Sequence, residues 1–128
     1  MTIKEWQVKI NEWCTRKGWN ENLVLGNMIA NLHTEISEAW EEIRNNRKVD
    51  EIYGHAPISI NNSSFLCGIE SLARDATIKP EGFPIELADL AIQLFHLCEY
   101  CGIDLEKMIE LKMAYNETRS YRHGGKKA

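Results

Sequence analysis

The sequence lacks several features that identify common classes of protein. It contains no G-x-x-x-x-G-K-[ST] loop, which excludes a P-loop enzyme as far as a sequence can exclude one. No apolar stretch is long enough to cross a bilayer, and the first residues carry charges throughout, without the apolar core of a signal peptide. We therefore expect a cytoplasmic protein that has no membrane partner.

The sequence also lacks an excess of positive charge. Lysine and arginine number 15 against 19 aspartates and glutamates, and the formal net charge is −4 at pH 7. This balance argues against a general nucleic-acid partner. No internal repeat and no strand pattern is convincing, and a length of 128 residues predicts a single domain that spans residues 1–128.

Cysteine is scarce, but two of the four cysteines, Cys98 and Cys101, have the C-x-x-C spacing. This spacing is that of half a zinc site or of a redox pair. However, the sequence offers no second C-x-x-C and no paired-histidine half. In a reducing compartment we expect the thiols to be buried and inert.

What the sequence does contain is helical periodicity, which predicts an all-α fold with four main helices. They cover, approximately, residues 3–16, 21–46, 84–100 and 105–118. Thr2 and Glu5 form a capping box for the first helix, and Asn20 and Asp104 are expected to cap the second and the fourth. The broad apolar stripe of the second helix suits contact with several neighbours, so we expect oligomerisation to complete the bundle.

Between about residues 45 and 84 the periodicity weakens, and glycine, proline, asparagine and serine are frequent. We expect a long loop with one short helix after Ser63 and Ser64, because a structureless loop of that length is improbable in a compact domain. Residues 119–128 form a basic tail.

Two acidic pairs stand out in the second and third predicted helices. Glu35 and Glu38, like Glu86 and Asp89, are three residues apart, which separates them by about 60° around a helix. Four converging carboxylates would repel one another and lose hydration unless a cation compensated them. Oxygen ligands favour a hard cation, so the pattern predicts a site for Mg²⁺ or Mn²⁺.

Acidic residues at this spacing more often form a solvated helix face, and that interpretation stays open for each pair alone. The apolar residues around both pairs favour the metal site. A ferritin-like di-iron site would need E-x-x-H ligands. The residues three before His33, His96 and His123 are not glutamates; they are Ala30, Gln93 and Ser120.

A metal held by carboxylates commonly shares its coordination shell with substrate phosphates, whose remaining charge needs cations. The sequence supplies such cations in and after the fourth predicted helix. The candidates are Lys112, Arg119, Arg122, Lys126 and Lys127. The alternative for the tail is a disordered, solubilising end.

Taken in order, these motifs resemble those of a known family. Glu35-Ile-Ser-Glu38 and Glu86-Leu-Ala-Asp89, followed by Lys112, Asn116 and Arg119, are similar to the signature of the MazG-like all-α NTP pyrophosphohydrolases. That signature is E-x-x-E, then E-x-x-D, then a lysine, an asparagine and an arginine. The likeness runs from about residue 17 through the tail, leaving out the middle loop.

The resemblance implies Mg²⁺-dependent hydrolysis of a nucleoside triphosphate between its α and β phosphates, in nucleotide-pool control. Glu35, Glu38, Glu86 and Asp89 would be the catalytic acids and metal ligands. Lys112, Asn116 and Arg119 would contact phosphates or close the site, while the base that activates water stays open among Glu38, Glu41 and Glu42. The family forms dimers or tetramers. The alternative is a non-catalytic nucleotide-binding or regulatory module.

Two departures from the family pattern stand out. The segment between Glu38 and Glu86 is longer than in the compact pattern, and His96 stands where relatives tend to have an acid. The middle loop is therefore expected to reshape or cover the nucleotide site, and the number or affinity of metal ions to differ. Trp6, Trp19 and Trp40 are candidates to stack a base, the alternative being a place in the core.

Overall fold

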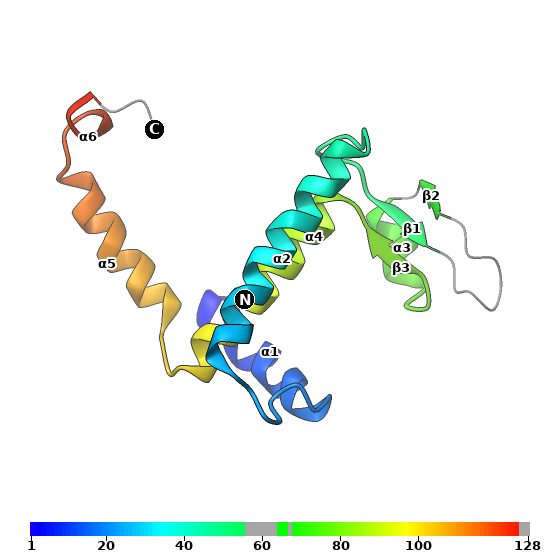
Figure 1. The fold of residues 1–128 in the computed structure, drawn as a ribbon, viewed down its shortest axis with the longest axis horizontal. Coiled ribbons are helices and arrows are strands. Elements are labelled where there is room, and N and C mark those ends of the chain that lie inside the picture. Colours follow the sequence, from blue (N-terminus) through cyan, green and yellow to red (C-terminus); the bar gives the residue numbers. More distant parts are fainter. Residues whose placement is uncertain (56–63, 67, 126–128) are drawn as a thin grey trace. The chain divides into compact units, whose positions relative to one another are not determined.

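The structure, a computed structural model, describes residues 1–55, 64–66 and 68–125. Helices make up most of this part, as predicted, and it also contains a small three-stranded sheet (Figure 1). The chain divides into two compact units. The first unit consists of Met1–Glu21 with Phe95–Ala128, and the second unit of Asn22–Leu94. The oligomerisation and the single domain expected from the sequence stay predictions.

Six helices lie within the described residues, and the four long ones confirm the four predicted from periodicity. They are α1 (Ile3–Arg16), α2 (Leu25–Arg44), α3 (Ile69–Arg74), α4 (Phe83–Tyr100), α5 (Leu105–Glu117) and α6 (Arg122–Gly125). The capping box of Thr2 and Glu5 and the cap of Asp104 are present as predicted. The short α3 confirms that the middle loop contains a helix, but its expected start after Ser63 and Ser64 is wrong, because Ser64 belongs to a strand and α3 begins after Gly68. The helix α6 lies in the basic tail.

The start of the second helix was predicted wrongly. It begins at Leu25, after Val24, which makes no capping hydrogen bond with a side chain. The side chain of Asn20 bonds elsewhere, its Nδ2 donating to Thr15 Oγ1 at 2.7 Å. The left-handed backbone of Asn22, with a φ of 56°, also prevents the helix from starting earlier.

The sheet corrects the expectation that the chain has no strands. It consists of β1 (Tyr53–His55), β2 (Ser64–Leu66) and β3 (Lys79–Glu81), in the order β2-β1-β3 and with antiparallel pairing throughout. Strands of three residues are too short to show the alternation of apolar and polar residues by which strands are recognised. The tertiary partners of these segments therefore decide their conformation.

In the first unit, the fully buried amide of Gln7 links α1 to the turn between α4 and α5. Its Nε2 donates to the carbonyl of Ile103 at 2.8 Å and to Glu99 Oε2 at 3.3 Å, while its Oε1 accepts from the backbone N–H of Leu105 at 3.0 Å. The side chain is therefore satisfied at both ends, as a buried polar group has to be.

Replacing Gln7 with alanine is expected to lower the free energy of unfolding by about 2–4 kcal/mol, because the amide and carbonyl it binds lose their partner inside the protein. Urea unfolding followed by circular dichroism measures the change. Val8→Ala, at a partly exposed neighbour, is the control and should cost less than about 1 kcal/mol. Equal losses in both variants would contradict the role of the amide.

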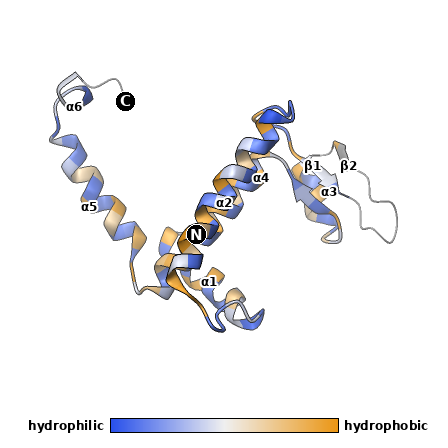
Figure 2. Cartoon of the chain, viewed as in Figure 1, coloured by the Kyte–Doolittle hydropathy of each residue, from blue (hydrophilic) through white to orange (hydrophobic). Residues whose placement is uncertain are grey.

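Hydrophilic residues interrupt the hydrophobic ones along α1, α2 and α5 (Figure 2). None of the helices in the described part of the chain combines the length and the apolarity that crossing a membrane requires. Nevertheless, α2 carries an exposed apolar stripe, whose members follow one another at spacings of four and seven residues. We call it the α2 stripe, and it consists of Leu25, Ile29, Ile36 and Trp40.

Candidate metal centre

The four predicted acids lie on two helices of the second unit that contact each other. Glu35 and Glu38 belong to α2, and Glu86 and Asp89 to the first turns of α4. Gly82, after β3, begins α4: its carbonyl accepts the backbone N–H groups of Ile85 and Glu86, each at 3.0 Å. The glycine thereby fixes where along the chain the second acidic pair enters its helix.

The structure brings Glu35, Glu86 and Asp89 together, with one carboxylate oxygen of each residue within 4.8 Å of the others. Glu38 is exposed and is not one of these three, but its charge acts on them and raises the pKa of Glu35 and of Glu86. We call these four residues the acidic cluster. Its acids therefore converge across the contact between α2 and α4, as a site for a divalent cation requires.

Two oxygens of the acidic cluster have no partner. Glu35 Oε2 and Glu86 Oε2 are buried, and neither accepts a hydrogen bond. A buried carboxylate oxygen without a partner is costly, because it has lost its water and gained nothing in exchange. A hard cation would satisfy both oxygens, and carboxylates are the ligands that Mg²⁺ and Mn²⁺ prefer, so the residues fit such an ion.

The acidic cluster holds its protons more tightly than isolated acids do. Burial, followed by the charges of Asp89 and Glu38, raises the pKa of Glu86 from 4.5 to about 7. Burial is also the largest cause of the raised pKa of Glu35 and of Asp89, and the charge of Glu38 adds to it in both. A divalent cation would displace these protons, so its binding should strengthen as pH rises.

This electrostatic cost predicts how the stability of the metal-free protein depends on pH. Because the pKa of Glu86 is higher in the folded chain than its ordinary value of 4.5, the unfolded chain loses its proton first as pH rises. Stability should therefore fall between about pH 4.5 and pH 7, by an amount on the order of 1–2 kcal/mol once solvent screening is allowed for.

Thermal unfolding in the presence of a chelator, measured from pH 4 to pH 8, tests this expectation. Glu86→Gln should flatten the decline and raise the midpoint at pH 7, and Mg²⁺ or Mn²⁺ should raise the midpoint of the wild type at pH 7. If the unfolding midpoint of Glu86→Gln declines with pH as steeply as that of the wild type, the Glu86 carboxylate does not cause the loss of stability.

Gln93 contributes to the site and was not predicted. Its Nε2 donates to Glu35 Oε1 at 2.6 Å, so one oxygen of Glu35 is held by α4 while the other stays unpaired. Gln93 follows Asp89 by four residues and Glu86 by seven, which places all three on one face of α4. That spacing is the signal from which the residue could have been found.

The predicted phosphate-binding residues belong to the first unit, where the structure describes their local contacts. The Nζ of Lys112 lies 4.9 Å from the ring centroid of Tyr115, and the guanidinium carbon of Arg119 lies 5.8 Å from it. Asn116 Nδ2 is 3.8 Å from Met113 Sδ. The contact of Arg122 is with the ring of Tyr121, whereas Lys126 and Lys127 lie outside the described residues. Their contact with phosphate stays a prediction.

Several other residues singled out from the sequence differ in their environment from what was expected. Trp6, Trp19 and Trp40 are all exposed, so a place in the core is wrong for each. Cys98 is buried as expected, but Cys101, which follows the last residue of α4, is exposed.

His96 is half-buried in the first unit. Its Nε2 lies 2.6 Å from Asn20 Oδ1, and burial lowers its pKa, so it is neutral near pH 7. Because Asn20 offers this nitrogen an oxygen, His96 donates through Nε2.

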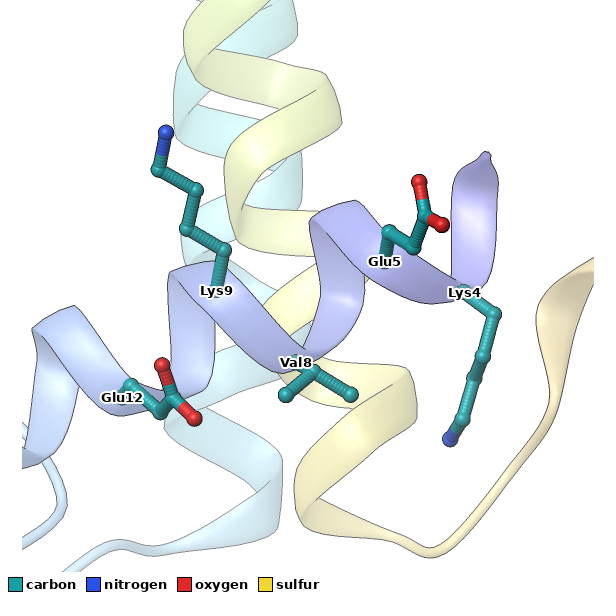
Figure 3. A pocket seen from close by; sticks show the side chains of 5 residues that line it. All are labelled: Lys4, Glu5, Val8, Lys9 and Glu12. Carbon is teal, nitrogen blue, oxygen red and sulfur yellow. The ribbon is translucent and has the colours of Figure 1, made fainter. Parts of the chain in front are cut away.

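A hollow beside α1 gathers none of the predicted site residues. Its lining comes from a single helix and consists of Lys4, Glu5, Val8, Lys9 and Glu12 (Figure 3). Charges of both signs alternate there, and the side chains of Lys4 and Lys9 point to different sides of the helix. The hollow therefore carries no functional assignment.

Comparison with known proteins adds no assignment, since no family model, no curated protein and no solved structure matches this chain.

Proposed function

We propose that this protein hydrolyses nucleoside or deoxynucleoside triphosphates between the α and β phosphates, releasing a monophosphate and pyrophosphate in a Mg²⁺-dependent reaction. It would act as a MazG-like pyrophosphohydrolase in nucleotide-pool control in the cytoplasm. The observation that carries the proposal is the acidic cluster, with two buried carboxylate oxygens that have no partner. The order of the acidic and basic motifs supports it.

Glu35, Glu86 and Asp89 would hold the ion, with Glu38 completing the set from the exposed side. When bound, Mg²⁺ supplies a Lewis acid for phosphate oxygens and lowers the pKa of water that it coordinates. Gln93 orients Glu35 through its 2.6 Å hydrogen bond, which helps to aim the free oxygen of that residue.

In the proposed reaction, the oxygen of a water molecule forms a bond to the α phosphorus. The bond from this phosphorus to the bridging oxygen breaks, and pyrophosphate leaves with that oxygen and its electron pair. A carboxylate accepts the proton of the water. The contacts favour Glu38 for this role, because Glu41 is paired with Arg44 at 2.8 Å and Glu42 accepts the hydroxyl of Tyr53 at 2.9 Å.

The α2 stripe supports a homodimer or homotetramer. Its four residues are exposed and lie within about 60° of one another around α2, on a different side of that helix from the acids. An apolar helix face of this kind favours association with a second copy.

Sedimentation equilibrium measures the state of assembly, and Ile36→Glu should shift it toward the monomer.

A screen of nucleoside and deoxynucleoside triphosphates, with and without Mg²⁺, tests the activity through the release of pyrophosphate. Pyrophosphate formed with Mg²⁺ from at least one nucleotide, with the matching monophosphate, is the expected result. Release of orthophosphate alone would show cleavage at another bond and would contradict the proposal. Thermal stabilisation by nucleotide and Mg²⁺ without any release would favour the non-catalytic alternative.

A further inference from the structure

Lys79, in β3, lies on the face of the sheet that is turned toward α2. In the antiparallel pairing of β1 with β3, Tyr53 is opposite Glu81 and His55 is opposite Lys79, so these four side chains share one face. The hydroxyl of Tyr53 donates to Glu42 on α2 at 2.9 Å. This bond places the shared face against α2.

The same face of α2 carries part of the acidic cluster. Glu35, Glu38 and Glu42 are separated by three and four residues and therefore lie along one side of the helix. The hydrogen bond from Tyr53 to Glu42 therefore sets the face that carries Lys79 against the side of α2 that carries these acids. The positive charge of Lys79 interacts with Glu38 and Glu86, and it opposes the rise in the pKa of Asp89.

The ion pair of Lys79 with Glu81 does not use all the hydrogen-bond donors of the ammonium group. The ammonium is paired with Glu81 Oε1 at 3.2 Å, and the side chain of Lys79 is 74 % exposed. The other oxygen of Glu81 lies 3.4 Å from His55 Nδ1, so Glu81 serves two partners across the sheet. An ammonium has three donors, and Lys79 therefore keeps capacity for a further acceptor.

A triphosphate that approaches the acidic cluster meets charges of its own sign. A bound cation offsets part of this repulsion, and the phosphate oxygens that the ion does not contact need another positive group. Lys79 provides one at the rim of the cluster, on a flexible side chain that reaches into solvent. Because Lys79 lies on a strand, it can approach the anion from a different side than the acids of α2 and α4 do.

We propose that Lys79 is a substrate-binding residue, whose ammonium contacts the oligophosphate of the nucleotide and of its pyrophosphate product. This inference rests on the proposed function. Before substrate binds, Glu81 holds the ammonium beside the cluster, and phosphate oxygens then complete its hydrogen bonds.

The inference is tested with three variants of the full chain: Lys79→Gln, Lys79→Arg and, as the matched control, Lys48→Gln. Lys48 is exposed and belongs to the same unit. Two titrations followed by calorimetry are compared for each protein, one with Mn²⁺ alone and one with inorganic pyrophosphate in the presence of Mn²⁺. The KM and kcat of pyrophosphate release from a nucleotide are measured in parallel.

Lys79→Gln should weaken pyrophosphate binding and raise KM by about tenfold, the effect expected for a lost hydrogen bond between charged groups. The binding of Mn²⁺ alone should stay equal or become up to about threefold tighter, because a positive charge that repels the ion is gone. Lys79→Arg should restore most of the affinity for pyrophosphate, and Lys48→Gln should change neither titration.

The opposite directions of the two effects separate substrate binding from a structural role. If Lys79→Gln weakens Mn²⁺ and pyrophosphate by the same factor, the residue only shapes the cluster and the inference is overturned. Unchanged pyrophosphate binding, or a wild type that does not bind pyrophosphate, overturns it as well.

The failure of the inference is distinguishable from that of the proposed function. A wild type that hydrolyses nucleotides while Lys79→Gln behaves as Lys48→Gln does would refute the inference alone. A wild type that releases no pyrophosphate from any nucleotide refutes the proposed function, and the pyrophosphate titration still decides whether Lys79 binds phosphate.

Discussion

Asp89→Asn is expected to lower the rate of pyrophosphate release by about a thousandfold or more while raising the stability of the metal-free protein. The amide keeps the size of the side chain but removes one of the three charges that converge on the proposed ion. The pKa of Asp89 is raised by burial and by Glu38, so the charge is held at a cost when no cation is present. Its removal therefore relieves repulsion in the fold while it weakens the site.

Two measurements on the same protein establish this result: the Mg²⁺-dependent release of pyrophosphate, and thermal unfolding in the presence of a chelator at pH 7. Glu41→Gln is the control, because Glu41 is an exposed acid of α2 that is paired with Arg44. It should keep most of the activity. An Asp89→Asn protein with full turnover would remove this residue from the mechanism, and a loss of both activity and stability would indicate a folding defect instead.

Gly82→Ala is expected to destabilise the second unit by about 3 kcal/mol or more, and to reduce activity with it. Gly82 has a φ of 124°, which side-chain-bearing residues rarely adopt, and an added Cβ would lie 2.3 Å from the backbone carbonyl oxygen of Glu51. Because that contact is with backbone, the chain before β1 or the start of α4 would have to move. Either movement would shift Glu86 relative to Glu35.

Gly26→Ala is the matched control for Gly82→Ala. Gly26 lies in α2, and an added Cβ there would meet nothing within 4 Å. Since alanine favours the helix more than glycine does, this variant should be neutral or up to about 1 kcal/mol more stable. Urea unfolding of both variants gives the two changes. A loss below about 1 kcal/mol for Gly82→Ala would show that the backbone adapts around the new methyl group.

The helices were predictable because their signals are local. The Thr2 and Glu5 capping box and the Asp104 cap each involve residues within three positions of one another, and both are present. The start of α2 was missed because the side chain of Asn20, a good capping residue, forms hydrogen bonds with Thr15 and His96 instead. Such competition between partners depends on tertiary structure and is invisible in the sequence.

The strands were missed for a different physical reason. β1 contains only Tyr53, Gly54 and His55, and β3 contains Pro80, a residue that usually argues against a strand. What holds the sheet in place is distant in the sequence: Tyr53 bonds to Glu42, and the guanidinium carbon of Arg47 lies 3.9 Å from the centroid of the Tyr53 ring. Contacts of this kind form only once the chain has folded, so the sequence alone does not predict them.

In the candidate site, too, local features were predictable from the sequence and tertiary interactions were not. Spacing alone predicted that Glu35 and Glu38 share a side of one helix, and Glu86 and Asp89 a side of another. Gln93 and Lys79 were missed because their importance comes from interactions across elements. Gln93 donates a hydrogen bond to Glu35, and the charge of Lys79 interacts with acids of both helices.

The first unit contains a reciprocal arrangement of two helix starts. The first backbone N–H of α1, at Ile3, donates to Glu106 Oε1 of α5 at 3.0 Å, and the first N–H of α5, at Leu105, donates to Gln7 Oε1 of α1 at the same distance. Amide protons in a first helical turn have no partner within the helix, and they usually exchange rapidly with deuterium. These two should exchange slowly and together, so a mass spectrum of deuterium uptake would report the docking of α1 on α5 at the very positions where protection is normally absent.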